Sequence, residues 1–98
     1  MSVDAQKRMR ALSVHEPYAT RIIAGQKPIE YRTWFTKYRG LLAIHASKPT
    51  GAILGTVELV DVRGRIGRQG FEWHLRNPNP FRKAIRCRGR QGLFWVNL

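Results

Sequence analysis

The sequence has one cysteine, six acidic residues and no long apolar run. The single thiol, Cys87, cannot form an internal disulfide, which excludes a disulfide framework and agrees with a reducing compartment. No stretch reaches the roughly 18 apolar residues that a membrane-spanning helix needs, and residues 1–10 lack the apolar core of a signal peptide. We therefore expect a cytoplasmic protein with no membrane partner, in which Cys87 is a structural thiol.

Candidate metal ligands are also few and scattered. His15, His45, His74 and Cys87 show none of the close spacings typical of zinc sites. We therefore expect no metal and no cofactor.

Length and hydrophobic content indicate one small domain. The 98 residues are 43% hydrophobic and include three Trp, three Tyr and four Phe, which is enough for one packed core and too many for a disordered segment. No internal repeat or low-complexity linker divides the chain. We expect a basic N-terminal tail over residues 1–10 and a single domain over residues 11–98, while the oligomeric state stays open.

A large positive charge is the strongest compositional signal. Eighteen Lys and Arg against six Asp and Glu give a formal net charge of +12, and such a field attracts polyanions through phosphate contacts and counterion release. The excess is uneven, because residues 63–98 contain nine basic residues and one acidic residue, Glu72. We therefore expect a nucleic-acid partner, with a solvated basic surface as the alternative interpretation.

Short apolar stretches predict a mixed α+β domain that is mainly β. Pro17 suits the first position of a helix, and Tyr18, Ile22 and Ile23 follow at helical spacing, so that one side of the helix packs on a sheet. The helix is expected over residues 17–24, and extended stretches over residues 11–14, 29–34, 41–47, 51–62, 71–75, 85–87 and 93–96. A small β-barrel of five to six strands with one short helix near the N-terminus is the expected fold.

The turn that leads from the helix into the next strand carries three charged side chains. Gly25 suits the residue after a helix end, where a positive φ favours glycine, and Lys27 follows it. Strand alternation then places Glu30, Arg32 and Trp34 on one face. We interpret the three charged residues as a site, with a structural ion-pair cluster as the alternative.

Seven short motifs follow one another from residue 12 almost to the end of the chain. They are Leu12-Ser13-Val14-His15-Glu16-Pro17-Tyr18-Ala19, Gly25-x-Lys27-x-x-Glu30-x-Arg32, Lys37-Tyr38-Arg39-Gly40, Ile44-His45-Ala46-Ser47, Gly55-x-Val57-Glu58-Leu59-Val60-Asp61, Asn77-Pro78 and Gly92-Leu93-Phe94-Trp95-Val96. Each motif alone is a weak signal, but in this order they resemble the ASCH domain of the PUA-like superfamily.

The resemblance implies a PUA-like β-barrel beside a helix, with a cleft lined by the Lys27 to Arg32 motif, and work on RNA. A few ASCH domains resemble ribonucleases, and a related branch hydrolyses acetylated cytidine. In that branch the position matching Glu30 is a threonine nucleophile, which this chain lacks. Many ASCH domains also carry a longer insertion where this chain has residues 63–70, so we expect an open cleft.

The leading functional hypothesis is an RNA-binding module without catalysis. Single-stranded or structured RNA would lie in the basic cleft, with cationic side chains on phosphates and Trp34 under a base, whereas Tyr18 is expected in the core. The expected nucleic-acid-binding residues are Lys27, Glu30, Arg32, Trp34, Lys37, Arg39 and Ser47.

Two enzymatic hypotheses stand beside it. In a metal-independent ribonuclease, Lys27 would stabilise the developing phosphorane charge and Tyr38 or His45 would move the proton. His45 and Ser47 share a strand face, so that the hydroxyl is a candidate partner of the base. An amidohydrolase acting on an acetylated nucleoside ranks lower, because the threonine nucleophile is missing.

Overall fold

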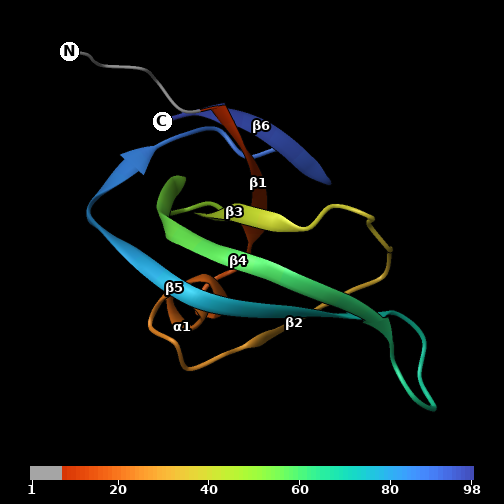
Figure 1. Ribbon diagram of the computed structural model, residues 1–98. Coiled ribbons are helices and arrows are strands. Elements are labelled where there is room, and N and C mark those ends of the chain that lie inside the picture. Colours follow the sequence, from red (N-terminus) through yellow and green to blue (C-terminus); the bar gives the residue numbers. More distant parts are fainter. Residues whose placement is uncertain (1–7) are drawn as a thin grey trace.

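Residues 8–98 fold into six strands and one short helix. A computed structural model describes residues 8–98 (Figure 1). The elements are β1 (Arg8–Val14), α1 (Tyr18–Ile23), β2 (Ile29–Arg32), β3 (Gly40–Ala46), β4 (Ala52–Gly64), β5 (Phe71–Arg86) and β6 (Leu93–Asn97). The predicted class, mainly β with one early helix, is therefore confirmed.

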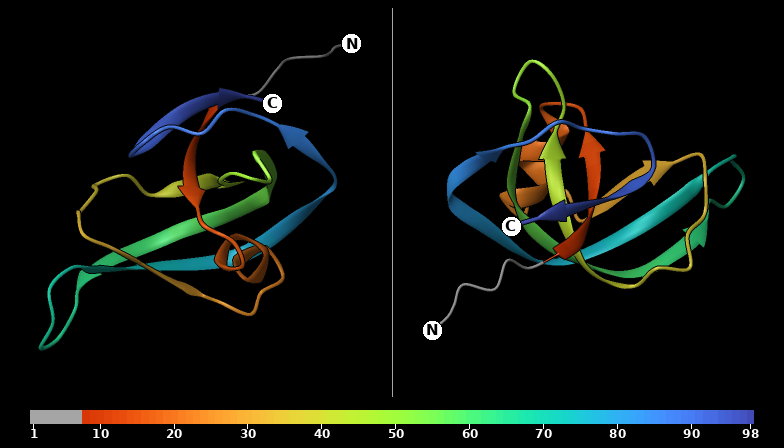
Figure 2. Two further views of the ribbon diagram at one scale, coloured as in Figure 1. Left: turned by 180° about the vertical axis from the view of Figure 1, so that it is seen from behind. Right: turned by 90° about the horizontal axis from the view of Figure 1, so that it is seen from above.

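All six strands join one sheet in the order β2-β5-β4-β3-β1-β6. Strands β1 and β3 are parallel, and the other neighbouring strands are antiparallel. Figure 2 shows the sheet curling around the core. The sheet does not close into the predicted β-barrel, because within residues 8–98 the short end strands β2 and β6 pair with β5 and β1 but not with each other.

The first strand starts earlier than the sequence predicts. It begins at Arg8, so the last three residues of the predicted tail over residues 1–10 belong to β1, where Arg8 pairs with Asn97 of β6. The remainder of the predicted tail, residues 1–7, lies outside the described residues. The division into a tail and one domain over residues 11–98 stays a prediction.

Strand β5 runs unbroken where the sequence predicts two separate extended stretches, over residues 71–75 and 85–87. Pro78 and Pro80 lie inside it, in a stretch where the register with β4 shifts repeatedly. Such bulges tolerate proline because the ladder is already irregular there. Gly55 of β4 permits the close approach of β5 at this point, since a Cβ on residue 55 would lie 2.3 Å from the backbone oxygen of Asn79.

Apolar side chains pack on both faces of the sheet. On one face, α1 covers a cluster that contains the fully buried Trp73, and on the other face a smaller cluster contains Ala43 and Phe94. The expectation that Tyr18 lies in the core is wrong. Its side chain is 48% exposed, because α1 turns its other apolar residues toward the sheet.

Candidate functional site

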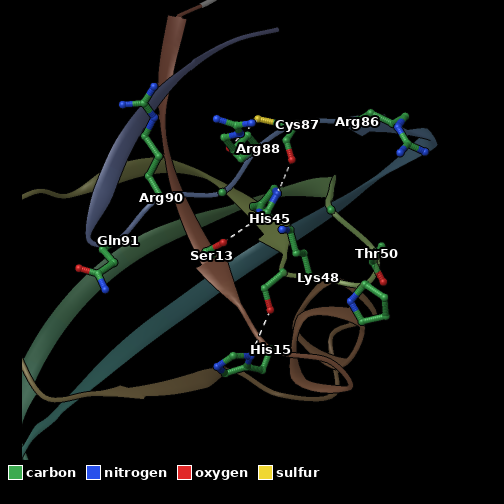
Figure 3. A pocket seen from close by; sticks show the side chains of 14 residues that line it. Ser13, His15, His45, Lys48, Thr50, Arg86, Cys87, Arg88, Arg90 and Gln91 are labelled. Atoms are coloured by element: carbon green, nitrogen blue, oxygen red, sulfur yellow. Dashed lines mark hydrogen bonds between the residues drawn. The ribbon is translucent and has the colours of Figure 1, made fainter.

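A hollow of about 1340 Å³, here named the main cleft, opens where β1 and β3 end beside the segment that links β5 to β6 (Figure 3). A second hollow of about 500 Å³, the side hollow, shares five lining residues with it. The main cleft is lined by Ser13, His15, His45, Ser47, Lys48, Pro49, Thr50, Gly51, Arg86, Cys87, Arg88, Gly89, Arg90 and Gln91. The side hollow adds Arg32, Trp34 and Gly92.

The lining of both hollows is cationic. No described residue in either lining is acidic, and the Lys and Arg side chains are Arg32, Lys48, Arg86, Arg88 and Arg90. Cations that converge without carboxylates raise the local positive potential. The two hollows therefore favour an anionic guest.

The pairing of β1 with β3 brings Ser13 and His45 together. They are register partners on parallel strands, so their side chains project from the same face of the sheet. Ser13 Oγ lies 2.6 Å from His45 Nδ1, and His45 Nε2 lies 2.6 Å from the carbonyl oxygen of Cys87. His45 thus ties both strands to the segment that carries Arg88 and Arg90.

These contacts fix how the ring of His45 is protonated when it is neutral. A carbonyl oxygen can only accept, so Nε2 carries the hydrogen and donates it to Cys87. Nδ1 then has a free lone pair and accepts the hydrogen of the Ser13 hydroxyl.

The predicted partnership of His45 with Ser47 is wrong. Ser47 Oγ lies 3.1 Å from Nδ1 of His15, in the turn after β1, while His45 faces Ser13. The sequence shows that His45 and Ser47 share a strand face, but the partner from another strand depends on the register of the sheet. Ser47 lines both hollows.

Lys27, Glu30 and Arg32 form one ion-pair chain. Lys27 Nζ lies 3.6 Å from Glu30 Oε1, and Arg32 Nε lies 3.1 Å from Glu30 Oε2. The second contact is an ion pair without hydrogen-bond alignment, since Arg32 Nε is buried and has no hydrogen-bond partner. Glu30 is 8% exposed and contacts both cations, so the ion-pair cluster is present, and a binding role for its members stays a prediction.

The ends of this chain face different hollows. Arg32 lines the side hollow and donates from its terminal nitrogen to the carbonyl oxygen of Ser13 at 2.6 Å. Lys27 lines a separate cavity of about 60 Å³ and donates to the carbonyl oxygen of Ile29 at 2.7 Å. The structure therefore brings Arg32 to the cationic hollows and leaves Lys27 outside them.

Trp34 is half-buried at the border of the core. Its ring meets that of Trp73 edge to face, with 4.8 Å between the centroids. The rest of its surface lines the side hollow. The predicted placement of Trp34 at a cleft is consistent with this position.

Lys37, Tyr38 and Arg39 line neither hollow. The Tyr38 hydroxyl donates to the carbonyl oxygen of Leu41. Arg39 donates to the carbonyl oxygen of Thr36 at 2.8 Å. The three predicted site residues thus lie apart from His45 and Arg32.

Apart from Arg32, sequence reasoning did not single out the residues that make the hollows basic. Arg86, Arg88 and Arg90 come from the end of β5 and the segment after it, and Lys48 from the turn after β3. The only signal was the excess of basic residues over residues 63–98. That excess predicts a basic face but not its position in the fold.

The sequence of residues 12–85 matches the ASCH domain. The chain belongs to the ASCH domain family. The fold agrees with this assignment and with the PUA-like superfamily. The ASCH protein of Zymomonas mobilis superposes with a TM-score of 0.76 at 18% identity, covering 89% of this chain and 86% of that chain. A mutant of that protein with one tyrosine changed to phenylalanine gives a TM-score of 0.77 at 16% identity, with coverages of 89% and 88%. At such identities the likeness shows the fold alone.

One curated human protein also matches. Activating signal cointegrator 1 of Homo sapiens is 46% identical over 41 residues, which are 40% of this chain and 7% of that protein. The match therefore spans a small part of the relative's length.

Two further features are absent from residues 8–98. The described helix is too short to cross a membrane. In the same part of the chain, no three His, Cys, Asp or Glu side chains gather in a way that could hold a metal ion.

Proposed function

We propose that this ASCH domain binds RNA, with the phosphate backbone in the main cleft and the side hollow. The observation that carries the proposal is the lining itself, which among residues 8–98 contains five Lys or Arg residues and no acidic residue, and in which Arg32 alone is ion-paired, to Glu30 behind the lining. Each phosphate neutralised by such a side chain releases condensed counterions. The net charge of +12 adds long-range attraction to the same guest.

The cations of the lining differ in how many contacts hold them. Arg32 is fixed by Glu30 and by the Ser13 carbonyl, so it presents a preformed positive site in the side hollow. Arg88 and Arg90 are exposed in the lining of the main cleft, so their charges are accessible to the phosphates of the guest. Trp34 offers a partly exposed ring beside Arg32, and stacking of an unpaired base contributes roughly 1–3 kcal/mol. Stacking favours single-stranded RNA over a closed duplex.

Fluorescence anisotropy with a short labelled single-stranded RNA tests the proposal. We expect Arg32→Ala and Arg90→Ala each to weaken binding more than Arg68→Ala, because Arg68 is exposed on the loop between β4 and β5 and lines neither hollow. DNA of the same sequence measures the preference for RNA. Equal losses in the three variants would show diffuse attraction and contradict binding in the cleft.

A metal-independent ribonuclease is the second candidate function. The observation in its favour is that His45, a base whose Nδ1 is unprotonated and accepts from the Ser13 hydroxyl, lies in the lining of the main cleft. Lys27 and Tyr38 are not in that lining, so the proton transfer would rest on His45. Cleavage of RNA in the presence of EDTA, lost in His45→Gln while binding persists, is the expected result of this function.

A further inference from the structure

A hydroxyl, an imidazole and a carbonyl form a chain in the wall of the main cleft that RNA binding does not use. Ser13 Oγ donates to His45 Nδ1 at 2.6 Å, and His45 Nε2 donates to the Cys87 carbonyl at 2.6 Å. The order is that of a nucleophile, a base and a group that orients the base. In such a chain the imidazole can take the proton of the hydroxyl as the hydroxyl oxygen attacks a substrate.

A buried histidine that merely satisfies its own hydrogen bonds would show the same distances. The difference in exposure between the two side chains favours a catalytic role over a purely structural one. His45 is 2% exposed and therefore shielded from water, whereas Ser13 is part-exposed and lines both the main cleft and the side hollow. A protected base beside a reachable hydroxyl is the arrangement that nucleophilic catalysis needs.

Gly89 keeps one flank of the pair free of a side chain. A Cβ on this residue would lie 2.5 Å from Ser13 Oγ and 2.6 Å from His45 Cε1. Any other residue would therefore press on the hydroxyl or push the segment of Arg88 and Arg90 away. The chain thus has the one residue type that fits against the pair.

We propose that Ser13 is a catalytic nucleophile with His45 as its general base, and that the pair hydrolyses carboxylic esters of phosphate-bearing alcohols. Ser13 Oγ attacks the ester carbonyl carbon while its proton passes to His45 Nδ1. The tetrahedral intermediate collapses, the ester C–O bond breaks, and the leaving alkoxide takes the proton from His45. Water then attacks the acyl-serine with His45 as base, which releases the carboxylic acid and restores the Ser13 hydroxyl.

The chemistry of the cleft selects this substrate class. The orienting group is a neutral carbonyl, which stabilises an imidazolium less than a carboxylate does, so esters are favoured over the less reactive amides. Lys48 and Arg88 line the same cleft (Figure 3). Their positive charges favour the negative charge that develops on the carbonyl oxygen. The surrounding arginines hold the phosphate of the alcohol.

This inference shares its cleft with the proposed RNA binding and rests on it only for phosphate recognition. An acyl ester on the ribose of a nucleotide or of an RNA end meets both requirements. The covalent step needs no RNA, so it is testable by itself. Failure of RNA binding and failure of acyl transfer are therefore separate results.

Labelling of the unmodified protein tests the nucleophile directly. The chain is treated with a fluorophosphonate, and the modified residue is located by peptide mass spectrometry. We expect phosphonylation at Ser13, and a burst of p-nitrophenol on mixing with p-nitrophenyl acetate. Labelling at another residue, or no labelling under conditions that modify a serine hydrolase, overturns the proposal.

Variants separate a catalytic from a structural role. Ser13→Ala is expected to lower the burst about 100-fold or more, and His45→Gln by a similar factor. Thr33→Ala, which removes an exposed hydroxyl outside both linings, is expected to behave as the unmodified chain. Ser13→Cys keeps a nucleophile and is expected to retain a burst even if Ser13→Ala folds poorly. An unchanged burst in folded Ser13→Ala overturns the proposal.

A substrate pair tests phosphate recognition. The probes are 3′-O-acetyl-adenosine 5′-monophosphate and 3′-O-acetyl-adenosine, which differ in the phosphate alone. We expect a higher kcat/KM for the phosphorylated ester, with a difference that shrinks as salt rises. Equal values at low salt overturn the substrate class, even where Ser13 is labelled.

Discussion

Glu30 and Arg32 lie 3.1 Å apart across an ion pair, and it is the arginine alone that reaches the cationic hollows. The carboxylate also pairs with Lys27 on its other side, at 3.6 Å. One buried negative charge thus holds two cations that would otherwise repel each other. In this structure the motif of Lys27, Glu30 and Arg32 holds the Arg32 side chain between Glu30 and the Ser13 carbonyl, in the lining of the side hollow.

Glu30→Gln tests this role. The change leaves two part-buried cations without their shared counter-charge, so we expect a loss of about 1–3 kcal/mol in the free energy of unfolding. Urea unfolding measures it. Glu58→Gln is the matched control, because Glu58 is exposed and its described partner is the amide of Asn77, and we expect its effect to stay within about 0.5 kcal/mol. Similar losses in both variants would contradict the shared-pair interpretation.

Much of the fold follows from the sequence, because alternation and helix signals act over a few residues. The helix near residues 18–23 and the strand positions are local matters. Closure of a sheet into a barrel is not a local matter, since it depends on whether the end strands β2 and β6 meet after the four strands between them have bent. The expected break between residues 75 and 85 is wrong for the same reason, because Pro78 and Pro80 are tolerated through register shifts that Gly55 permits on the partner strand.

The site divides in the same way. The cluster of Lys27, Glu30 and Arg32 is visible in the sequence because strand alternation and a short turn bring it together. The pair of Ser13 and His45 is not visible in the sequence, since the two residues are 32 positions apart and meet through the register of parallel strands. Local patterns predict which side chains share an element, and only topology decides what faces them.

Gly89→Ala tests how closely the cleft depends on the packing of its loop. The added Cβ collides with Ser13 and His45, so the segment that carries Arg88 and Arg90 has to move. We expect RNA binding to weaken roughly 5-fold, equivalent to about 1 kcal/mol. Gly64→Ala is the control, because a Cβ there meets nothing within 4 Å. Anisotropy titration of both variants decides, and equal affinities would show that the loop position does not matter.

Asp61 makes the free energy of unfolding depend on pH. Its hydrogen bond from Arg63, at 2.6 Å, lowers the pKa of the Asp61 carboxyl against an opposing effect of desolvation. A lowered folded-state pKa stabilises the fold above the unfolded value of about 3.9, and this stabilisation is lost as the pH falls through the folded value. We expect Asp61→Asn to be less stable than the unmodified chain at pH 7 and equally stable near pH 2. Urea midpoints that differ by the same amount at both pH values would contradict this.

The salt dependence of RNA binding counts the phosphate contacts in the cleft. For a single strand, the slope of log K against log salt is about 0.7 per neutralised phosphate, so that removing two contacts lowers the slope by about 1.4. We expect this change for the double variant Arg88→Ala with Arg90→Ala, because both side chains line the main cleft. The control pair, Arg68→Ala with Arg82→Ala, removes two exposed cations from outside both linings and is expected to change the slope by less than half as much. Anisotropy at a series of potassium chloride concentrations gives the slopes. Equal changes of slope in the two double variants would mean that RNA binding depends on the net charge of the chain alone. A strand bound in the cleft is expected to respond to the position of the lost cations.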